Sequence, residues 1–384
     1  MKKQRLWQKI PYYLRILCIA VLFFPVLSCN ITEEIPKSWD TAQPLHEIYQ
    51  NDFLIGNIIS PGDLNTVRFN YLKRHFNTVT AENHMKPENI APNTRPANDN
   101  WAYQWTNADR IVNAARAEGM GVVGHILIWH SQTPPWLTRN TNGTALDRET
   151  VLYNLEKYVT DVADHFKGKL IAWDVVNEAM RDGLSESDAA DWKNCQRPIT
   201  ENGWRAIGPE YIEKAFLAAR AADPGVKLYY NDYSLNNANK ARAVYNMVND
   251  INTRYPNVEG RKLIDGIGMQ SHHRIYTVPQ TVETSIQLFA SLGVEIAISE
   301  LDIIAAGGLL DGSPPWNDNA ARLQAAQYAA MFRIFKNHTS VIKRVTFWGI
   351  DDGTSWRSAS HPTLLNADYS LKPAFHAVTN PHGY

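Results

Sequence analysis

Ile171-Ala-Trp-Asp-Val-Val-Asn177-Glu178 is an apolar run that ends in an amide and a carboxyl side chain. Glu295-Ile-Ala-Ile-Ser-Glu300 is a second run of this kind, and it also ends in a glutamate. Short, largely apolar runs are typical of strands that are buried on both faces of a parallel sheet. The two runs therefore predict two buried strands, each of which presents a glutamate at its carboxyl end.

Eight such runs are spaced along the chain, with amphipathic stretches between them. The predicted strands are 53–59, 78–81, 121–128, 171–176, 227–230, 266–269, 296–299 and 345–348. Helical periodicity is clear in 107–118, 148–166, 209–222, 240–254 and 320–336. This alternation predicts a single α/β domain with the (β/α)8 TIM-barrel fold. An open doubly wound sheet is the main alternative, but it usually has fewer strands and a glycine-rich loop after the first, where this chain has Ser60-Pro61.

Polar and aromatic side chains follow nearly all of these predicted strands. Because the carboxyl ends of barrel strands meet at one rim, these side chains are expected to share one cleft. In chain order they are Glu82, Asn83, Lys86, His125, Trp129, Gln132, Asn177, Glu178, Tyr233, Gln270, His272, Glu300, Asp302, Trp348 and Trp356. Carboxylates, amides, imidazoles and indoles on one rim suit a polar ligand with apolar faces, such as a sugar chain.

Glu178 and Glu300 belong to the fourth and seventh predicted strands, on opposite sides of the barrel mouth. A glycosidic bond is cleaved by two such carboxyl groups. One protonates the leaving oxygen, and the other attacks the sugar carbon or activates water. The pair therefore predicts glycoside hydrolysis.

Four histidines near the same rim, His125, His130, His272 and His273, raise the alternative of a metal site. None of them pairs with another at the HExxH spacing of a helical zinc site. We therefore expect neither a metal ion nor another cofactor. Cys195 has no adjacent His or Asp motif, so it is expected to be a structural or surface thiol rather than a nucleophile.

Seven motifs, in order between about residues 53 and 376, resemble those of glycoside hydrolase family 10, the retaining endo-β-1,4-xylanases. They are Thr80-Ala-Glu-Asn-His-Met-Lys86-Pro, Gly124-His-Ile-Leu-Ile-Trp129-His-Ser-Gln132, Trp173-Asp-Val-Val-Asn177-Glu178-Ala, Tyr230-Asn-Asp-Tyr233, Gly268-Met-Gln-Ser-His272, Ser299-Glu-Leu-Asp302 and Phe347-Trp-Gly-Ile-Asp-Asp-Gly-Thr-Ser-Trp356. Many barrel glycosidases share an Asn-Glu pair, so the specificity of the resemblance comes from the seven motifs together.

The resemblance implies roles in the chemistry for five residues. Glu178 would be the general acid/base, and Glu300 would be the nucleophile. His272 would hold Glu300 in its ionised form, and Asp302 would orient the imidazole of His272. Asn177 would hydrogen-bond the 2-hydroxyl of the sugar under attack.

The remaining rim residues would bind the substrate. Tyr233 and Gln270 are expected to contact it directly. Trp348 and Trp356 would close over the position of a hydroxymethyl group, which favours xylose over glucose. The sugar upstream of the cut would contact Glu82, Asn83, Lys86, His125, Trp129 and Gln132.

The expected partners are xylan and xylo-oligosaccharides. The 38 Lys and Arg residues nearly balance the 39 Asp and Glu residues, which gives no electrostatic sign of a nucleic-acid partner. Two alternatives stay open: a related barrel hydrolase acting on mixed β-glucan or aryl glycosides, and a lipoprotein that binds xylan without cleaving it. The sequence departs from the family pattern at His273 and in the loop 305–316, which leaves the leaving-group side of the cleft undefined.

Residues 1–28 have the pattern of a bacterial lipoprotein signal peptide, in which a basic head precedes an apolar run, Ile16 to Leu27, that is too short to span a membrane. Val26-Leu27-Ser28-Cys29 resembles a lipobox, whose cysteine carries the lipid. We expect residues 29–44 to be a flexible tether and 45–384 the catalytic domain. Since Asn30 rather than aspartate follows the cysteine, the expected location is the outer membrane or cell surface of a Gram-negative bacterium, with membrane contact through the lipid alone. An ordinary cleaved signal is the alternative.

Overall fold

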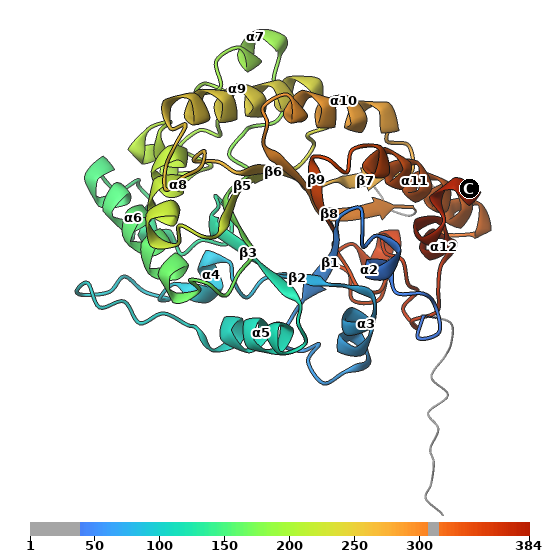
Figure 1. Cartoon of the computed structure of the whole chain (residues 1–384). Helices are drawn as coiled ribbons and strands as arrows, with labels where there is room; N and C mark the ends of the chain where they lie inside the picture. Colours follow the sequence, from blue (N-terminus) through green and yellow to red (C-terminus); the bar gives the residue numbers. More distant parts are fainter. Residues whose placement is uncertain (1–38, 306–314) are drawn as a thin grey trace, which may run out of the picture. The chain divides into compact units, whose positions relative to one another are not determined.

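Eight parallel strands form a closed barrel in this computed structural model, which describes residues 39–305 and 315–384 (Figure 1). Neighbouring strands pair in parallel, and the ring closes because β9 pairs with β1 and β8 pairs with both β6 and β9. The predicted (β/α)8 barrel is therefore confirmed. The strands are β1 (Leu54–Ile59), β2 (Thr78–Ala81), β3 (Gly121–Ile128), β4 (Ala172–Asn177), β5 (Lys227–Asp232), β6 (Gly266–Met269), β8 (Glu295–Ile304) and β9 (Ile342–Phe347).

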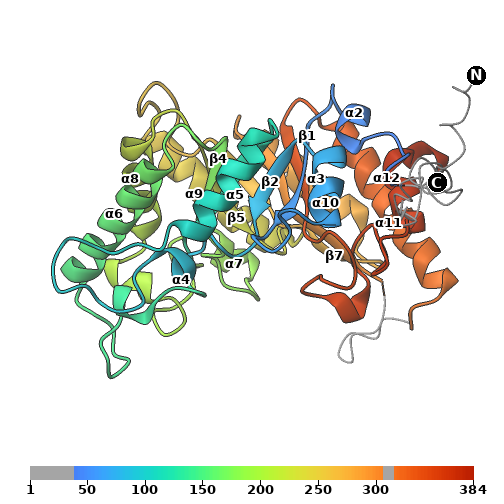
Figure 2. The ribbon, with the colours of Figure 1, turned by 90° about the horizontal axis from the view of Figure 1, so that it is seen from below.

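Helices surround the strands in Figure 1. The longer ones are α3 (Val67–His75), α5 (Thr106–Ala117), α6 (Arg148–His165), α8 (Tyr211–Ala222), α9 (Ala238–Arg254), α10 (Pro279–Ala290), α11 (Asp318–Asn337) and α12 (Pro373–Thr379). The short ones are α2 (Leu45–Ile48), α4 (Pro87–Ile90), α7 (Glu186–Ala189), η1 (Pro135–Leu137), η2 (Gly203–Ile207), η3 (Ser358–Ser360) and η4 (Pro381–Gly383). Figure 2 shows α2 at one end of the barrel and α4, α7 and a further short strand, β7 (His272–Arg274), toward the other.

Several helices begin where a short polar side chain caps the first turn. The Asp147 carboxylate accepts from the backbone N–H of Thr150, so α6 starts at Arg148. The side chains of Asn237 and Asn317 cap α9 and α11 in the same way. These local signals explain why the helices expected from the sequence periodicity are present with small changes at their ends.

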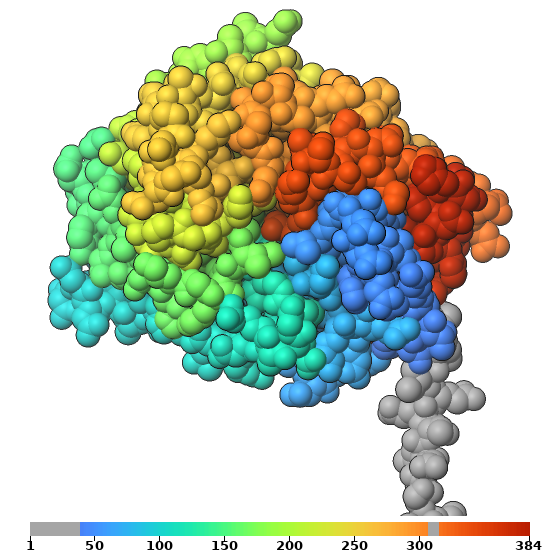
Figure 3. All heavy atoms as spheres, in the orientation of Figure 1, coloured from blue at the N-terminus to red at the C-terminus, as the bar shows by residue number. Residues whose placement is uncertain are grey.

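The main apolar core lies between the strands and the helices. It includes large, fully buried side chains such as Trp173, Tyr158 and Phe216. A small separate cluster consists of Val123, Ala172, Tyr229 and Ala297. Side chains close the middle of the ring on the face drawn in Figure 3, as expected for a packed barrel.

Strand β8 is longer than the sequence indicates, and this corrects the predicted strand 296–299. It continues past Glu300 to Ile304 because a further short strand, β7 (His272–Arg274), pairs with residues 302–304. Glu300 and Asp302 therefore lie within a strand rather than at its end. This pairing fixes the backbone that carries both carboxyl groups.

The amino-terminal boundary of the domain also differs from the expectation. Trp39 is buried and its ring lies edge-on to Tyr71, with centroids 5.5 Å apart. Nε2 of His75 lies 2.7 Å from the carbonyl oxygen of Trp39. Residues 39–44, which the sequence assigns to the tether, thus pack against the domain. The predicted signal peptide, Cys29 and the rest of the tether lie outside the described residues.

Candidate active site

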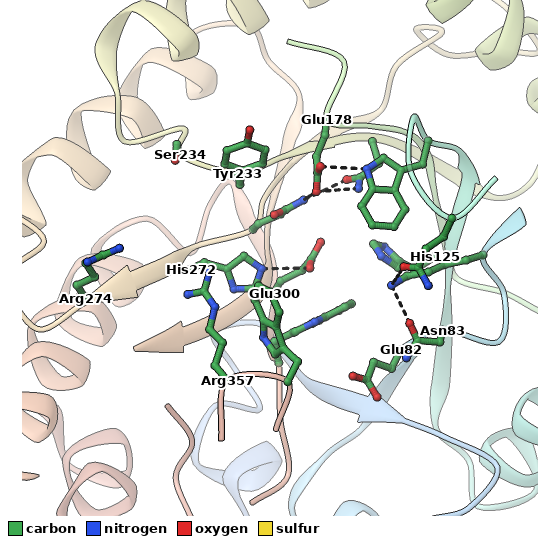
Figure 4. A pocket seen from close by; sticks show the side chains of 17 residues that line it. Glu82, Asn83, His125, Glu178, Tyr233, Ser234, His272, Arg274, Glu300 and Arg357 are labelled. Atoms are coloured by element: carbon green, nitrogen blue, oxygen red, sulfur yellow. Dashed lines mark hydrogen bonds and ion pairs between the residues drawn. The ribbon is translucent and has the colours of Figure 1, made fainter. Parts of the chain in front are cut away.

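A cleft of about 650 Å³ opens among the loops that follow the barrel strands (Figure 4). It brings together all of the residues that the sequence predicts for catalysis and substrate binding, apart from the orienting residue Asp302. These are Glu82, Asn83, Lys86, His125, Trp129, Gln132, Asn177, Glu178, Tyr233, Gln270, His272, Glu300, Trp348 and Trp356. The cleft therefore receives side chains from residues that are far apart in the sequence.

Three further residues line the cleft that the sequence analysis did not single out: Ser234, Arg274 and Arg357. Each lies one or two positions from a motif residue, namely Tyr233, His272 or Trp356. Their closeness in sequence to motif residues is the signal from which their place in the cleft could have been predicted. Both arginines bring positive charge to the wall that also carries His272 (Figure 4).

The Glu178 side chain is held by three donors. Its Oε2 accepts from the Trp129 indole at 3.0 Å, and its Oε1 accepts from the side-chain amides of Gln270 at 2.9 Å and Asn177 at 3.2 Å. The backbone of Glu178 has a φ of +54°, in the left-handed region that non-glycine residues rarely adopt. Glu178 therefore lies at a tightly fixed turn directly after β4.

Glu300 is almost fully buried beside different partners. Its Oε1 accepts from the Asn231 side-chain amide at 2.7 Å, and its Oε2 lies 3.3 Å from Nε2 of His272. Burial alone would raise the pKa of this carboxyl, but hydrogen bonding from His272 and Asn231 and the charges of His125 and His272 lower it. Glu300 is therefore kept ionised.

Asp302 lies behind His272, outside the cleft lining. Its Oδ2 is 3.0 Å from Nδ1 of His272 and accepts from the Trp356 indole at 3.0 Å. Burial opposes the charged form of His272, but Asp302 and Glu300 outweigh it and raise its pKa to about 9. The imidazole is thus a cation that lies between two carboxyl groups.

Asn231 links the two catalytic candidates, although the sequence analysis gave it no role. Its amide donates to Glu300 and, at 2.9 Å, to Oδ1 of Asn177, whose own amide donates to Glu178. Oδ1 of Asn231 accepts from the Ser299 hydroxyl at 2.5 Å. Its position in the motif Tyr230-Asn-Asp-Tyr233 indicated a place near the cleft. The hydrogen bonds that join its amide to Asn177 and Glu300 depend on tertiary packing and cannot be predicted from the motif.

The Lys86 ammonium anchors another part of the wall. It donates to Oδ1 of Asn83 at 2.9 Å and to Oε1 of Gln132 at 3.0 Å, and it lies 5.1 Å from the centroid of the Trp129 ring. Burial lowers the pKa of Lys86, and the nearby carboxylates of Glu300 and Glu82 oppose that effect. This wall is polar and preorganised by hydrogen bonds.

Trp348 and Trp356, which follow the last barrel strand, β9, differ in exposure. Trp348 is only 5% exposed, and its ring lies edge-on to His125 with centroids 5.1 Å apart. Trp356 is 53% exposed and lies edge-on to His272. Trp348 is therefore a fixed part of the cleft wall, whereas Trp356 is about half exposed, with the Arg357 guanidinium carbon 4.2 Å from the centroid of its ring.

Within residues 39–305 and 315–384, no group of three or more His, Cys, Asp and Glu side chains is arranged to hold a metal ion, and no helix is long and apolar enough to cross a membrane. Cys195 is buried, and its thiol donates to the carbonyl oxygen of Asp188 at 3.0 Å. Burial raises the pKa of this thiol to about 11. His273 is buried behind the cleft, where burial lowers its pKa to about 4.

A (β/α)8 barrel whose cleft holds Glu178 and Glu300, carried by two separate strands, has the architecture of a glycoside hydrolase. The sequence profile of glycosyl hydrolase family 10 matches residues 44–381. The chain belongs to this family.

Several relatives are similar over most of the chain. A β-1,4-xylanase of Dictyoglomus thermophilum is 34% identical over 372 residues, which are 93% of this chain and 96% of that protein. Endo-1,4-β-xylanase A of Thermotoga maritima is 36% identical over 346 residues, which are 88% of this chain. The chain spans 30% of the length of that protein and 32% of the Thermotoga neapolitana enzyme.

Solved structures agree with this assignment. A termite-gut GH10 xylanase that contains a bacterial Ig-like domain has a TM-score of 0.82 and 35% identity, with 91% of this chain and 79% of that chain covered. The intracellular xylanase of Thermoanaerobacterium saccharolyticum has a TM-score of 0.76 and 34% identity, with 88% and 98% covered. Mutants of that enzyme were solved with xylotriose and with xylotetraose.

Proposed function

We propose that this protein is a retaining endo-1,4-β-xylanase that cleaves internal β-1,4-xylosidic bonds of xylan. The observation that carries the proposal is the meeting of Glu178 and Glu300 in one cleft in unlike surroundings. Glu300 is kept ionised by His272 and Asn231, as a nucleophile must be. Glu178 contacts the neutral donors Trp129 and Gln270 rather than a cation, and in this proposal it carries out the proton transfers.

The reaction then has two steps. In the first, Glu178 donates its proton to the glycosidic oxygen while the Glu300 carboxylate attacks the anomeric carbon, so the C–O bond breaks and a glycosyl ester forms. In the second, Glu178 takes a proton from water, the resulting hydroxide attacks the same carbon, and Glu300 leaves. Two inversions give overall retention of configuration.

The neighbouring residues bind the sugar in this proposal. Asn177 donates to the 2-hydroxyl of the sugar under attack, a contact that strengthens in the transition state. Trp348 and Trp356 restrict the space beside that sugar. The upstream sugar is bound by the polar wall of Glu82, Asn83, Lys86, His125, Trp129 and Gln132.

Release of short oligosaccharides from xylan, compared with carboxymethylcellulose and mixed β-glucan, tests the function. The glucans belong in the assay because a relative in Acetivibrio thermocellus, 36% identical, is named Exoglucanase XynX. We expect release from xylan and little from the glucans. Equal or faster release from the glucans would favour the related-hydrolase alternative, and binding without release would favour the non-catalytic one.

We also propose that the exported protein is a lipoprotein attached through Cys29 to an outer membrane or cell surface. The support is the sequence alone, in which a basic head, a short apolar run and Val26-Leu27-Ser28-Cys29 precede the domain. Polymeric xylan does not cross membranes, so an external endo-acting enzyme would act where its substrate is.

A further inference from the structure

Arg197 lies between α7 and η2 in the chain and contacts both Glu178 and Tyr233, another residue of the cleft lining. Its Nε donates to the backbone carbonyl oxygen of Glu178 at 3.0 Å, and its Nη2 donates to the Tyr233 hydroxyl at 2.6 Å. Its Nη1 pairs with Glu201 at 3.2 Å. One planar guanidinium thus joins the turn after β4 to the aromatic side chain after β5.

The turn at Glu178 needs such support. A non-glycine residue in the left-handed region is strained and persists only where its surroundings fix it. The Glu178 N–H donates to the carbonyl oxygen of Asn231 at 2.9 Å, and its carbonyl oxygen accepts from Arg197. The next N–H, that of Ala179, donates to the Tyr230 hydroxyl at 3.1 Å. Among these supports, Arg197 is charged and also contacts Tyr233. Figure 4 shows Tyr233 on the side of Glu178 away from Glu82, Asn83 and His125, so under the proposed function it belongs to the leaving-group side of the cleft.

Tyr233 is itself held firmly. Its hydroxyl donates to Asp182 and accepts from Arg197. The ammonium of Lys240 lies 3.5 Å from the centroid of the Tyr233 ring, and it also pairs with Asp182 at 3.1 Å and with the buried Asp232 at 3.0 Å. Since Tyr233 also lines the cleft, one face of its ring is left for a sugar.

We propose that Arg197 is a positioning residue, which couples occupation of the leaving-group side of the cleft to the placement of the Glu178 carboxyl. The inference rests on the proposed function. A sugar packed on Tyr233 adds a further restraint on a ring that Asp182, Lys240 and Arg197 already hold, and the hydrogen bond to Arg197 transmits this to the Glu178 carbonyl. The coupling therefore matters for substrates that occupy this side and whose leaving group needs a proton.

The experiment compares xylohexaose with 2,4-dinitrophenyl β-xylobioside, whose leaving group needs no proton. Arg197→Ala should lower kcat/KM on xylohexaose about 100-fold, because displacement of a catalytic group by about 1 Å has that effect. On the aryl substrate the loss should stay within about threefold. Arg197→Lys should recover only part of the loss, because one ammonium does not reproduce the planar fork. Full recovery would contradict a bridging role.

Two further variants separate positioning from general folding effects. Arg139 donates to the carbonyl oxygens of Ile199 at 2.9 Å and Thr200 at 3.1 Å, so Arg139→Ala loosens the same loop without touching Glu178. It should keep both activities near those of the wild type. Tyr233→Phe removes the hydroxyl but keeps the ring, and it should show the same selective loss as Arg197→Ala even if the latter folds poorly.

The double variant of Arg197→Ala and Tyr233→Phe decides whether the two residues act together. The combined loss on xylohexaose should be clearly smaller than the product of the two single losses. Multiplicative losses, or equal losses on both substrates, would overturn the proposal. A wild type that cleaves neither substrate contradicts the proposed function instead, whereas an active wild type with an unimpaired Arg197→Ala contradicts only the positioning role.

Discussion

Nδ1 of His272 lies 3.0 Å from Oδ2 of Asp302, while Nε2 of the same ring lies 3.3 Å from Oε2 of Glu300. This position explains why the pKa of His272 rises to about 9 in spite of its burial. It also explains why the buried Glu300 remains an anion, since a cation lies beside it. The charge of Glu300, the proposed nucleophile, thus depends on a residue, Asp302, that does not line the cleft.

Asp302→Asn should lower the pKa of His272 by about one unit or more. The substitution removes the negative charge that contributes most to the stability of the imidazolium, while the side chain keeps its size and shape. The folded pKa lies above the ordinary value of 6.5, so His272 adds stability that is present below pH 6.5 and lost as pH rises through about 9. In Asp302→Asn that loss should occur at lower pH. The measurements are NMR titration of His272 and urea unfolding at several pH values.

Asp109→Asn is the matched control, because it removes the carboxylate that lies 2.8 Å from His165, a histidine on the outer helix α6. It should leave the His272 titration unchanged. An unaltered His272 titration in Asp302→Asn would show that this carboxylate does not set the charge of the imidazole.

The sequence predicts the cleft well because its residues follow local strand signals. Glu178 and Tyr233 lie within three residues of the ends of the predicted strands 171–176 and 227–230, so their places at the rim follow from the barrel alone. Arg197 was not predicted because it belongs to an irregular loop, and its contact with Glu178 depends on tertiary packing. The extension of β8 past Glu300 was missed for a similar reason, since it depends on pairing with β7.

Glu178→Ala and Glu300→Ala should fail differently. Without Glu178 there is no proton donor, so cleavage of xylan should fall by about 100-fold or more, while formation of the glycosyl ester from 2,4-dinitrophenyl β-xylobioside should continue. Without Glu300 there is no nucleophile, and both reactions should be lost. Steady-state and pre-steady-state kinetics on the two substrates measure the difference.

Azide and proton NMR distinguish the roles further. Azide should rescue Glu178→Ala with a β-linked product and Glu300→Ala with an α-linked product, because only the first retains the ester intermediate. The wild type should release the β-anomer of the reducing sugar first. An α-anomer as the first product would exclude Glu300 as the nucleophile.

Gly268→Ala should displace the side-chain amide of Asn231, which links Glu178 and Glu300 through Asn177. A Cβ at this position on β6 would lie 2.2 Å from Oδ1 of Asn231, so the Asn231 side chain must shift. Its hydrogen bonds to Glu300 and Asn177 would then be broken or bent. We expect kcat/KM on xylan to fall by about tenfold or more, since catalytic geometry is sensitive to small displacements. Circular dichroism should remain that of the wild type.

Gly62→Ala is the control for this substitution, because a Cβ at Gly62 meets no atom within 4 Å. It should retain full activity. Full activity in Gly268→Ala as well would mean that Asn231 moves without affecting Glu300, and that the linking amide is unimportant.

Trp356→Ala should raise activity on glucose-based aryl substrates relative to xylose-based ones, because exclusion of a hydroxymethyl group requires a steric barrier. The ratio of kcat/KM for the two aryl glycosides measures this. Trp348→Ala should change the ratio too, but it should also cost about 3–5 kcal/mol of stability because this indole is buried. An unchanged ratio in Trp356→Ala would remove the exposed indole from the selectivity argument.

Cys29→Ser tests the lipid anchor independently of the chemistry. The hydroxyl of serine does not replace the thiol to which the lipid is joined, so wild-type cells should incorporate radiolabelled palmitate into the protein and the variant should not. Wild-type protein should fractionate with membranes, and the variant should lose this association while xylan cleavage by the extracted domain stays the same. Protease treatment of intact cells then separates surface display from the inner face of an outer membrane. A wild-type protein that takes up no label would favour an ordinary cleaved signal, and it would leave the barrel and its two glutamates unaffected.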